Sequence, residues 1–131
     1  MGKKIYRNSR YLAWLRTRPC CVTGATIDVQ AAHIRLGLGG GMGIKPSDYR
    51  AVPIQAITHR QQHQMGEKAF WLLHAREPEV EIMRHLAAFC REIVTSSFAV
   101  CTILDHGRDV AEKIELLIDF IEGTRPTRYK K

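Results

Sequence analysis

The chain has 131 residues, of which 45% are hydrophobic and 25% are charged, a composition typical of a folded globular protein. This length predicts one domain over residues 1–131 that buries a core without disulfides. No apolar run reaches the roughly 18 residues that a membrane span requires, and no leader-like apolar segment follows the basic N-terminus. We therefore expect a cytoplasmic protein without a membrane partner.

Positive charge is concentrated in the first half of the chain. The net charge is +7, and residues 1–66 hold ten Lys or Arg against two acidic residues, whereas residues 67–131 hold ten against eleven. A basic face attracts nucleic acid through the release of counterions. Solubility alone would also explain a net charge, but it does not explain why the charge stays in one half. A nucleic-acid partner is therefore favoured.

Four cysteines are present, and the sequence predicts that they are free thiols. Cys20 and Cys21 are adjacent and cannot easily bond to each other, whereas Cys90 and Cys101 lie in apolar segments where cysteine is commonly a small buried hydrophobe. No CxxC pair occurs in the chain, so a zinc site of four thiolates is not supported.

The beginning of the chain predicts an arm followed by a helix. Residues 1–8 carry three cations and are expected to form a flexible basic tail. A helix is predicted from Ser9 and ended by Pro19, because three apolar residues recur at helical spacing on one face. These residues are Tyr11, Leu12 and Leu15.

The next stretch predicts a β-hairpin and a glycine-rich loop. β-Branched residues cluster without a helical period, which favours strands over residues 21–24 and 27–36 with a turn near Gly24. The loop over residues 37–50 holds five of the ten glycines, so its backbone must bend sharply or approach another group closely. It matches neither the dinucleotide-binding pattern nor the phosphate-binding loop of nucleotide hydrolases.

The remainder of the chain is predicted to be mainly helical. A strand over residues 51–54 precedes helices over 55–65 and 67–74, and Gly66 separates the two. Apolar residues at helical spacing predict a further helix over residues 79–98, whereas residues 99–104 fit either a helix or a strand. Asp105 is expected to cap a last helix that ends near residue 122, where Gly123 and Pro126 follow.

These elements predict the α+β class. The domain would contain a core of hairpin and helix over residues 9–75 that includes the N-terminal helix, and a helical C-terminal half over residues 78–123 that supports it. Residues 1–8 and 124–131 would form flexible basic tails.

Two histidines on the predicted helix over residues 55–65 are candidate metal ligands. His59 and His63 are four residues apart, so their imidazoles lie on one helical face and can reach a single ion. The same spacing also occurs among solvated residues of a helix surface. His33 by itself would be a buried core residue, but Arg35 lies on the same face of the strand. Cleavage of a phosphodiester needs such a base and such a cation.

Other polar and aromatic residues near these histidines leave alternatives open. Asp48 could bind the metal, orient the base, or cap the turn after Pro46. Glu67 is interpreted as a partner of a helix N-terminus and, less favourably, as a ligand. Phe70 is expected in the core and Trp71 partly over the site. His74, His85 and His106 are expected to be structural or surface residues.

The order of hairpin, Ala-His-Ile, loop, acidic residue, strand and HxxxH helix resembles the HNH endonucleases, which have a ββα-metal (His-Me finger) core. More narrowly, residues 11–71 resemble the Ref-like recombination-enhancement nucleases of phages and prophages. The residues that carry this resemblance are Pro19, Cys20, Cys21, Ala32, His33, Ile34, Arg35, Gly41, Met42, Gly43, Lys45, Pro46, Ser47, Asp48, Val52, Pro53, His59, His63, Gly66, Glu67, Phe70 and Trp71.

The resemblance implies a role for each matching residue. His33 would be the general base, and His59 and His63 would bind one catalytic divalent cation. Asp48 falls near the central Asn of the family, which fixes the base or the metal, so it is a candidate for both the catalytic and the metal set. Arg35 would assist catalysis at the phosphate. The expected DNA-binding residues are Arg35, Lys45, Arg50, Arg60, Arg16 and Arg18.

Departures from the family pattern shape the expected cofactors. Many relatives hold a structural zinc with two CxxC pairs, whereas this chain has Cys20 with Thr23 and Gln55 with Thr58, which predicts no structural zinc. Ala32 stands where many relatives have another metal ligand, which leaves more water on the catalytic ion. An open, hydrated site suits Mg²⁺ or Mn²⁺, and two imidazoles would also tolerate Zn²⁺ or Ni²⁺.

The resemblance implies a metal-dependent DNA endonuclease or nickase of phage or prophage origin. Water deprotonated by His33 would attack phosphorus and leave a 5′ phosphate and a 3′ hydroxyl. The expected partner is DNA, and a recombinase filament is a further candidate. The alternative is a catalytically decayed DNA-binding module on an HNH scaffold, which the lost thiolates favour. Retention of His33, His59 and His63 favours the enzyme.

Overall fold

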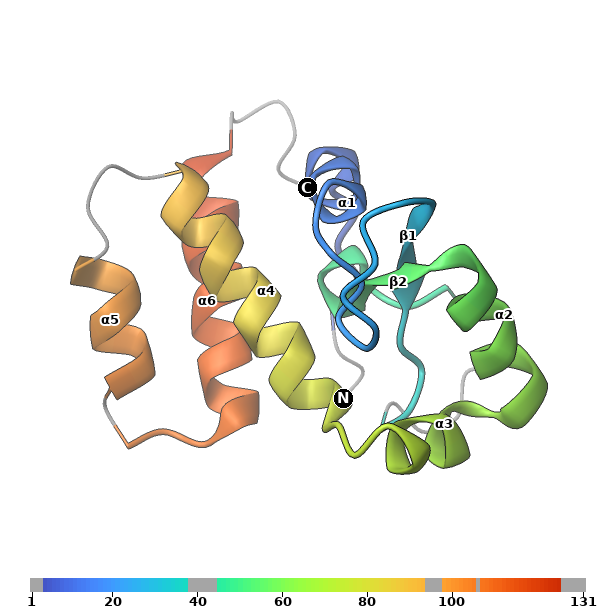
Figure 1. Ribbon diagram of the computed structural model, residues 1–131. Helices are drawn as coiled ribbons and strands as arrows, with labels where there is room; N and C mark the ends of the chain where they lie inside the picture. The colour runs from blue at the N-terminus through green and yellow to red at the C-terminus, as the bar shows by residue number, and fades with distance from the viewer. Residues whose placement is uncertain (1–3, 38–44, 94–97, 106, 126–131) are drawn as a thin grey trace. The chain divides into compact units, whose positions relative to one another are not determined.

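The computed structural model describes residues 4–37, 45–93, 98–105 and 107–125 (Figure 1). Over these residues the protein is mixed α+β, mostly helical with a two-stranded antiparallel sheet, which confirms the predicted class. The chain divides into two compact units, Met1–Ile82 and Met83–Lys131. The single domain over residues 1–131, with its core over residues 9–75 and its support over residues 78–123, stays a prediction.

The sheet of the first unit joins two segments that the glycine-rich loop separates in sequence. Strand β1, Val29–His33, pairs antiparallel with β2, Ala51–Gln55, and His33 lies opposite Ala51. The predicted partner of β1, residues 21–24, is not a strand. Residues 20–25 instead form a tight turn, because Cys20 accepts a hydrogen bond from the Gly24 amide and donates one to the Ala25 carbonyl, both at 2.8 Å.

Helix α1, Ser9–Arg16, forms as predicted and packs against this sheet. Asn8 caps its N-terminus, since the side-chain oxygen accepts a hydrogen bond from the Tyr11 amide at 3.1 Å. Tyr11 and Leu15 are fully buried, as the helical spacing of apolar residues predicted.

The residues before α1 are not a loose arm where the structure describes them. The Tyr6 amide donates to Ser47 Oγ at 3.4 Å, and the Tyr6 carbonyl accepts from the Asp48 amide at 2.9 Å. The prediction of a flexible tail over residues 1–8 is therefore corrected for residues 6–8, whose backbone is fixed to the loop before β2. Residues 1–3 and 126–131 lie outside the described residues.

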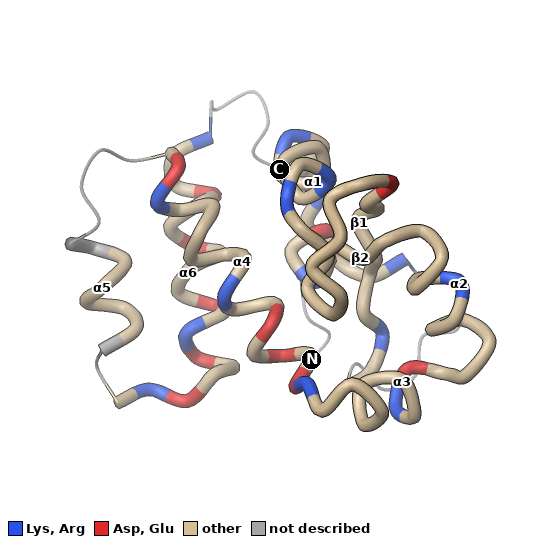
Figure 2. The backbone as a smooth tube through the Cα atoms, in the orientation of Figure 1, with Lys and Arg blue, Asp and Glu red and all other residues tan. Residues whose placement is uncertain are grey.

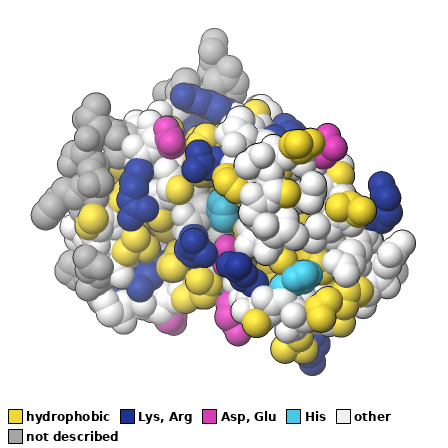
Figure 3. All heavy atoms as spheres, viewed as in Figure 1, with side chains coloured by type: hydrophobic (Ala, Val, Ile, Leu, Met, Phe, Trp, Pro, Cys, Tyr) yellow, Lys and Arg dark blue, Asp and Glu magenta, His cyan; other side chains and the backbone are white. Residues whose placement is uncertain are grey.

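A short 3₁₀ helix, η1 (Asp48–Arg50), leads into β2, and α2 (Ala56–Met65) and α3 (Glu67–Leu73) follow as predicted. Gly66 separates these helices at φ 90°, a conformation that favours glycine. Phe70 is in the core, as expected, but Trp71 is only 2% exposed and so belongs to the core as well. Exposed apolar side chains gather over α2 and α3 (Figure 3): Ile57, Met65, Leu72 and Leu73.

Helix α4, Pro78–Ile93, starts in the first unit and continues into the second, which also contains α5 (Phe98–Asp105) and α6 (Val110–Thr124). Helices α4 and α6 run side by side (Figure 1), and Cys90 Sγ lies 3.9 Å from the Leu117 carbonyl oxygen. The apolar face of α6 is buried at Ile114, Leu117 and Ile121.

Two expectations for the second unit are settled by these helices. Residues 99–104, which fitted either a helix or a strand, lie within α5. Asp105 ends α5 and does not cap α6; the cap is Asp109, whose carboxylate accepts a hydrogen bond from the Glu112 amide at 2.8 Å. Gly107 lies between the two helices at φ 64°, a positive value that glycine adopts without strain. The predicted helix over residues 79–98 ends at Ile93, and residues 94–97 lie outside the described residues.

Charge differs between the helices: α1 and α2 carry only Arg, whereas α3 carries both signs. Figure 2 shows Lys and Arg along α1 and around β2 and α2, whereas α4 and α6 carry both signs. Within the described residues, none of the helices combines the length and the apolar character needed to cross a lipid bilayer.

The core position of β2 gives a test of the fold. Ile54 is fully buried, whereas Ile57 in the first turn of α2 is 65% exposed. We expect Ile54→Ala to lower the free energy of unfolding by about 2–5 kcal/mol, because it removes buried methyl groups and leaves a cavity. The matched substitution Ile57→Ala should change it by less than about 0.5 kcal/mol. Equal losses in urea denaturation of the two variants would show that this packing is wrong.

Candidate active site

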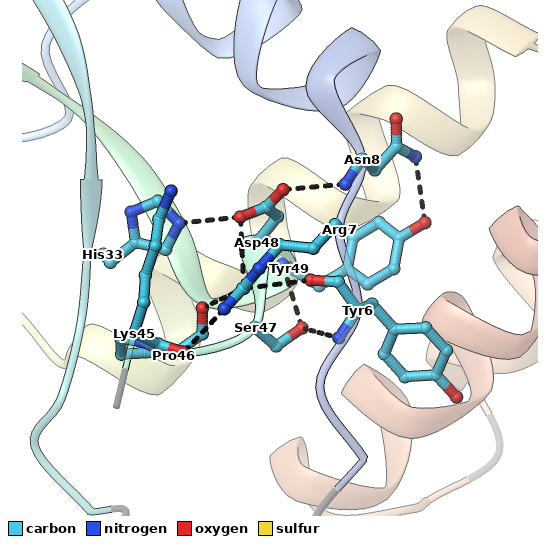
Figure 4. A network of polar contacts seen from close by, with 9 residues as sticks. All are labelled: Tyr6, Arg7, Asn8, His33, Lys45, Pro46, Ser47, Asp48 and Tyr49. Atoms are coloured by element: carbon cyan, nitrogen blue, oxygen red, sulfur yellow. Dashed lines mark hydrogen bonds and ion pairs between the residues drawn. The ribbon is translucent and has the colours of Figure 1, made fainter. Parts of the chain in front are cut away.

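The candidate base, His33, stands at the end of β1 and is held by Asp48 (Figure 4). Its Nε2 lies 2.9 Å from Asp48 Oδ1, and the His33 side chain is 16% exposed. An ionised carboxylate can only accept hydrogen bonds, so in the neutral ring Nε2 carries the proton and Nδ1 keeps its lone pair. Among the described residues no hydrogen-bond partner reaches Nδ1. The ring therefore has a fixed orientation and an available basic nitrogen.

Asp48 is itself held from the other side by the segment before α1. Its Oδ2 accepts a hydrogen bond from the Asn8 amide at 2.7 Å, and its Oδ1 lies 3.5 Å from Arg7 Nη1. Arg7 Nη1 also donates to the Pro46 carbonyl at 2.6 Å. The side chain of Asp48 is only 3% exposed, and the cap of η1 is Ser47. Of the three roles proposed for Asp48, this geometry matches orientation of the base.

The surroundings of His33 keep it neutral at neutral pH. Burial lowers its pKa below the ordinary value of 6.5. The hydrogen bond and the charge of Asp48 oppose that lowering of the pKa, while the positive charges of Lys45 and Arg7 add to it. Lys45 runs beside the His33 ring in Figure 4. A base must be unprotonated to accept a proton, so this balance favours the reactive form near pH 7.

The candidate metal ligands His59 and His63 meet on α2, as their spacing predicted. Their Nε2 atoms are 3.1 Å apart, and His59 Nδ1 lies 2.7 Å from the side-chain oxygen of Gln30 on β1. Burial lowers the pKa of His59, and the charges of His63 and His33 lower it further. His59 is therefore within electrostatic reach of both His63 and His33.

The separation of these two nitrogens fits a shared ion. Two ligands at about 2.0 Å from a tetrahedral ion lie about 3.3 Å apart, and adjacent ligands at about 2.1 Å from an octahedral ion lie about 3.0 Å apart. Over the residues that the structure describes, no three His, Cys, Asp or Glu side chains are grouped to hold a metal. An ion at His59 and His63 would need water or substrate oxygens, because the structure brings Asp48 to His33 instead.

Among the predicted DNA-binding residues, Arg50 requires a correction. It is buried at 7% exposure, and its guanidinium donates to the Ile34 carbonyl at 3.2 Å and to the Leu36 carbonyl at 3.0 Å. It also forms an ion pair with Glu79. A cation with these partners fixes the chain that leaves β1, so we remove Arg50 from the set expected to contact DNA.

The remaining predicted cations lie nearer the surface. Lys45 and Arg35 flank the ends of the loop after β1, Arg60 is on α2, and Arg16 ends α1. Arg18 lies over the Trp14 ring with its guanidinium carbon 5.3 Å from the ring centre. Exposed cations of this kind suit contacts to phosphate, which position a protein on DNA without reading its sequence.

Sequence reasoning missed the contacts of several residues that hold the site. Glu67 accepts hydrogen bonds from the Arg35 amide at 2.9 Å and the Leu36 amide at 2.8 Å, so it fixes the chain just after His33. Its place in the Gly66-Glu67 motif was the available signal. For Gln30, Arg7 and Asn8 the sequence carried no signal, because their contacts join segments distant in the chain.

The turn at Cys20 contains the first of the positions that the HNH resemblance compares with CxxC pairs. The Thr23 amide lies 3.5 Å from Cys20 Sγ, and the Cys21 amide donates to the Pro53 carbonyl on β2 at 2.9 Å. Burial alone would raise the pKa of the Cys20 thiol, but hydrogen bonds from Thr23 and from the Gln55 and Val22 backbones lower it overall. These bonds link the turn to the end of β2. The absence of a structural zinc stays a prediction.

The pairing of His33 with Asp48 predicts how the pKa of His33 responds to substitution. Asp48→Asn removes the charge that raises this pKa, so the pKa of His33 should be lower in the variant than in the wild type. The control Asp28→Asn makes the same charge change at an exposed residue whose φ of 57° asparagine tolerates. Titration of the His33 ring by NMR measures both variants. An unchanged or higher pKa in Asp48→Asn would mean that the carboxylate does not act on this ring.

Comparison with known proteins places the chain in a family. Residues 2–83 match the family described as protein of unknown function (DUF968). The match contains β1, β2, α2 and α3, and therefore His33, Asp48, His59 and His63. No curated protein matches the chain, and no solved structure does. Because the matched residues make up more than half of its length, the chain belongs to the DUF968 family.

Proposed function

We propose that this protein is a metal-dependent endonuclease or nickase that hydrolyses DNA phosphodiester bonds. The observation that carries the proposal is the orientation of His33, whose Nε2 is engaged by Asp48 so that Nδ1 remains a base. The paired nitrogens of His59 and His63 on α2 add a place for a cation nearby. A base and a cation site together are what hydrolysis of a phosphodiester requires.

The proposed core is of the ββα-metal type. Strands β1 and β2 pair, and α2 follows β2 directly and packs against both strands. The base would come from the first strand and the ligands from the helix, in the order that the HNH resemblance implies. This agreement between element order and residue roles supports the assignment beyond the motif alone.

The chemical step assigned to this chain is proton removal from water. His33 Nδ1 would accept the proton, and the Asp48 carboxylate at Nε2 would stabilise the resulting imidazolium. The water oxygen forms a bond to phosphorus as the bond to the 3′ oxygen breaks. The leaving oxygen takes a proton from solvent, which yields a 3′ hydroxyl and a 5′ phosphate, as in the resembling family.

A single divalent cation bound by His59 and His63 would polarise the phosphate and stabilise the leaving oxygen. Two imidazole ligands favour Mn²⁺, Zn²⁺ or Ni²⁺ over Mg²⁺, which prefers oxygen ligands. We therefore propose Mn²⁺ as the first metal to test and retain Mg²⁺ as the second. No structural zinc is proposed at Cys20.

DNA is the proposed substrate because the cations lie around this site. Lys45 is exposed beside His33, and its positive charge acts on that ring. Arg35 and Arg60 would contact neighbouring phosphates, while Arg16 at the end of α1 and Arg18 just after it would add further contacts. A recombinase filament remains a candidate partner on the basis of the Ref-like resemblance, and phage or prophage origin rests on the same resemblance.

A second candidate function is a DNA-binding module without activity on the same scaffold. Two points favour it: Thr23, Gln55 and Thr58 stand where the HNH resemblance implies thiolates, and the described residues offer two, not three, grouped metal ligands. Such a module would bind DNA with an affinity that falls steeply with salt concentration, and it would cleave nothing.

Conversion of supercoiled plasmid to open-circular or linear DNA tests the enzyme directly. We expect conversion with Mn²⁺ and none with chelator, a loss of at least about 100-fold in His33→Ala as the general base is removed, and a comparable loss in His59→Ala. His85→Gln on α4 is the matched histidine control and should cleave like the wild type.

The same assay separates the two candidate functions. Equal cleavage by wild type and His33→Ala would rule out the proposed base. Salt-dependent DNA binding by a folded wild type that cleaves no DNA form with Mn²⁺, Mg²⁺, Zn²⁺ or Ni²⁺ would support the inactive module instead.

A further inference from the structure

We propose that Gln30 is a positioning residue that fixes the tautomer of His59 and so aims the lone pair of its Nε2 at the cation. The inference rests on the proposed function, because it concerns the same metal site. Gln30 lies on β1, opposite Ile54 and on the strand that also carries His33. It does not touch the cation position itself and acts through His59.

The contact between Gln30 and His59 determines which ring nitrogen carries the proton. The side-chain oxygen of Gln30 lies 2.7 Å from His59 Nδ1. An amide oxygen can only accept a hydrogen bond, so Nδ1 must be the protonated nitrogen. A neutral imidazole has one such proton, which leaves Nε2 with a lone pair. This is the nitrogen that faces His63.

The two histidines therefore play unequal parts. Since His59 Nε2 is an acceptor, the 3.1 Å contact without metal requires His63 Nε2 to be the donor. To bind a cation, His63 must transfer that proton through solvent to its own Nδ1, and its exposed ring permits this. His59 is thus a prepared ligand, and His63 is the ligand that adapts.

The position of Gln30 makes this role specific. Its side chain is exposed on β1, so packing in the core does not account for a glutamine at this position. A hydrogen-bond acceptor outside the ligand set raises the basicity of a ligating histidine and holds its ring. Gln30, which would position the metal ligand His59, and the proposed base His33 lie on the same strand, β1.

Variants of Gln30 test the inference in metal-free and metal-bound protein without DNA. Gln30→Leu removes the acceptor, and we expect roughly 10-fold to 100-fold weaker Mn²⁺ binding, measured from the EPR signal of free Mn²⁺. In ¹⁵N NMR spectra of the metal-free protein, its His59 should lose the pure Nδ1–H form. Gln30→Glu keeps an acceptor and should retain both the tautomer and the affinity within about threefold. Gln61→Leu, an exposed glutamine on α2, is the matched control and should change neither.

Two results would overturn the inference. One is a wild-type His59 protonated at Nε2; the other is unchanged Mn²⁺ affinity in a folded Gln30→Leu variant. The outcome is independent of the plasmid assay. If Gln30→Leu loses Mn²⁺ affinity and the wild type cleaves no DNA, the role of Gln30 is supported and the nuclease proposal fails. Cleavage by a wild type with the wrong tautomer would leave the nuclease and remove the role of Gln30.

Discussion

The buried carboxylate of Asp48 is the constraint on which the candidate site depends. It contacts the candidate base His33 on β1 and the amide of Asn8 before α1, and Arg7 lies within ion-pair distance. A buried charge is costly unless it is paired and hydrogen-bonded, so these contacts are mutually required. Loss of any of them would leave the carboxylate less satisfied and the imidazole less well oriented. The segment before α1 is thus part of the site and not an appendage to it.

Strand β1 positions residues of both parts of the candidate site. Its pairing with β2 sets the direction of His33, and the same strand presents Gln30 to His59 on α2. In the segment after β1, Glu67 accepts hydrogen bonds from two backbone amides, and Arg50 donates hydrogen bonds to two backbone carbonyls. Sites on a strand fixed in this way are positioned more accurately than sites on a loop. The candidate base and the candidate metal ligands are consequently held by one small sheet and the helix that follows it.

Sequence periodicity was sufficient for the helices and insufficient for the pairing of the strands. Repeated apolar residues set α1 and α6, whereas the partner of β1 lies beyond the glycine-rich loop, and no local pattern encodes that register. The spacing of His59 and His63 predicted their meeting because it is local to one helix. Arg50 was misassigned because its charge suggested DNA, while only tertiary structure reveals the carbonyls and the carboxylate that bury it. Gln30 could not be found, since its partner is brought near by folding.

We propose that His33 and the paired histidines of α2 act on one phosphate. A crystal structure of His33→Ala with bound DNA and Mn²⁺ tests it most directly, because anomalous scattering locates the ion. We expect a Mn²⁺ peak between the Nε2 atoms of His59 and His63, with a DNA phosphate oxygen on the ion and the vacated His33 position facing the phosphorus. A Mn²⁺ ion at other residues, or DNA bound away from this pair, would contradict it.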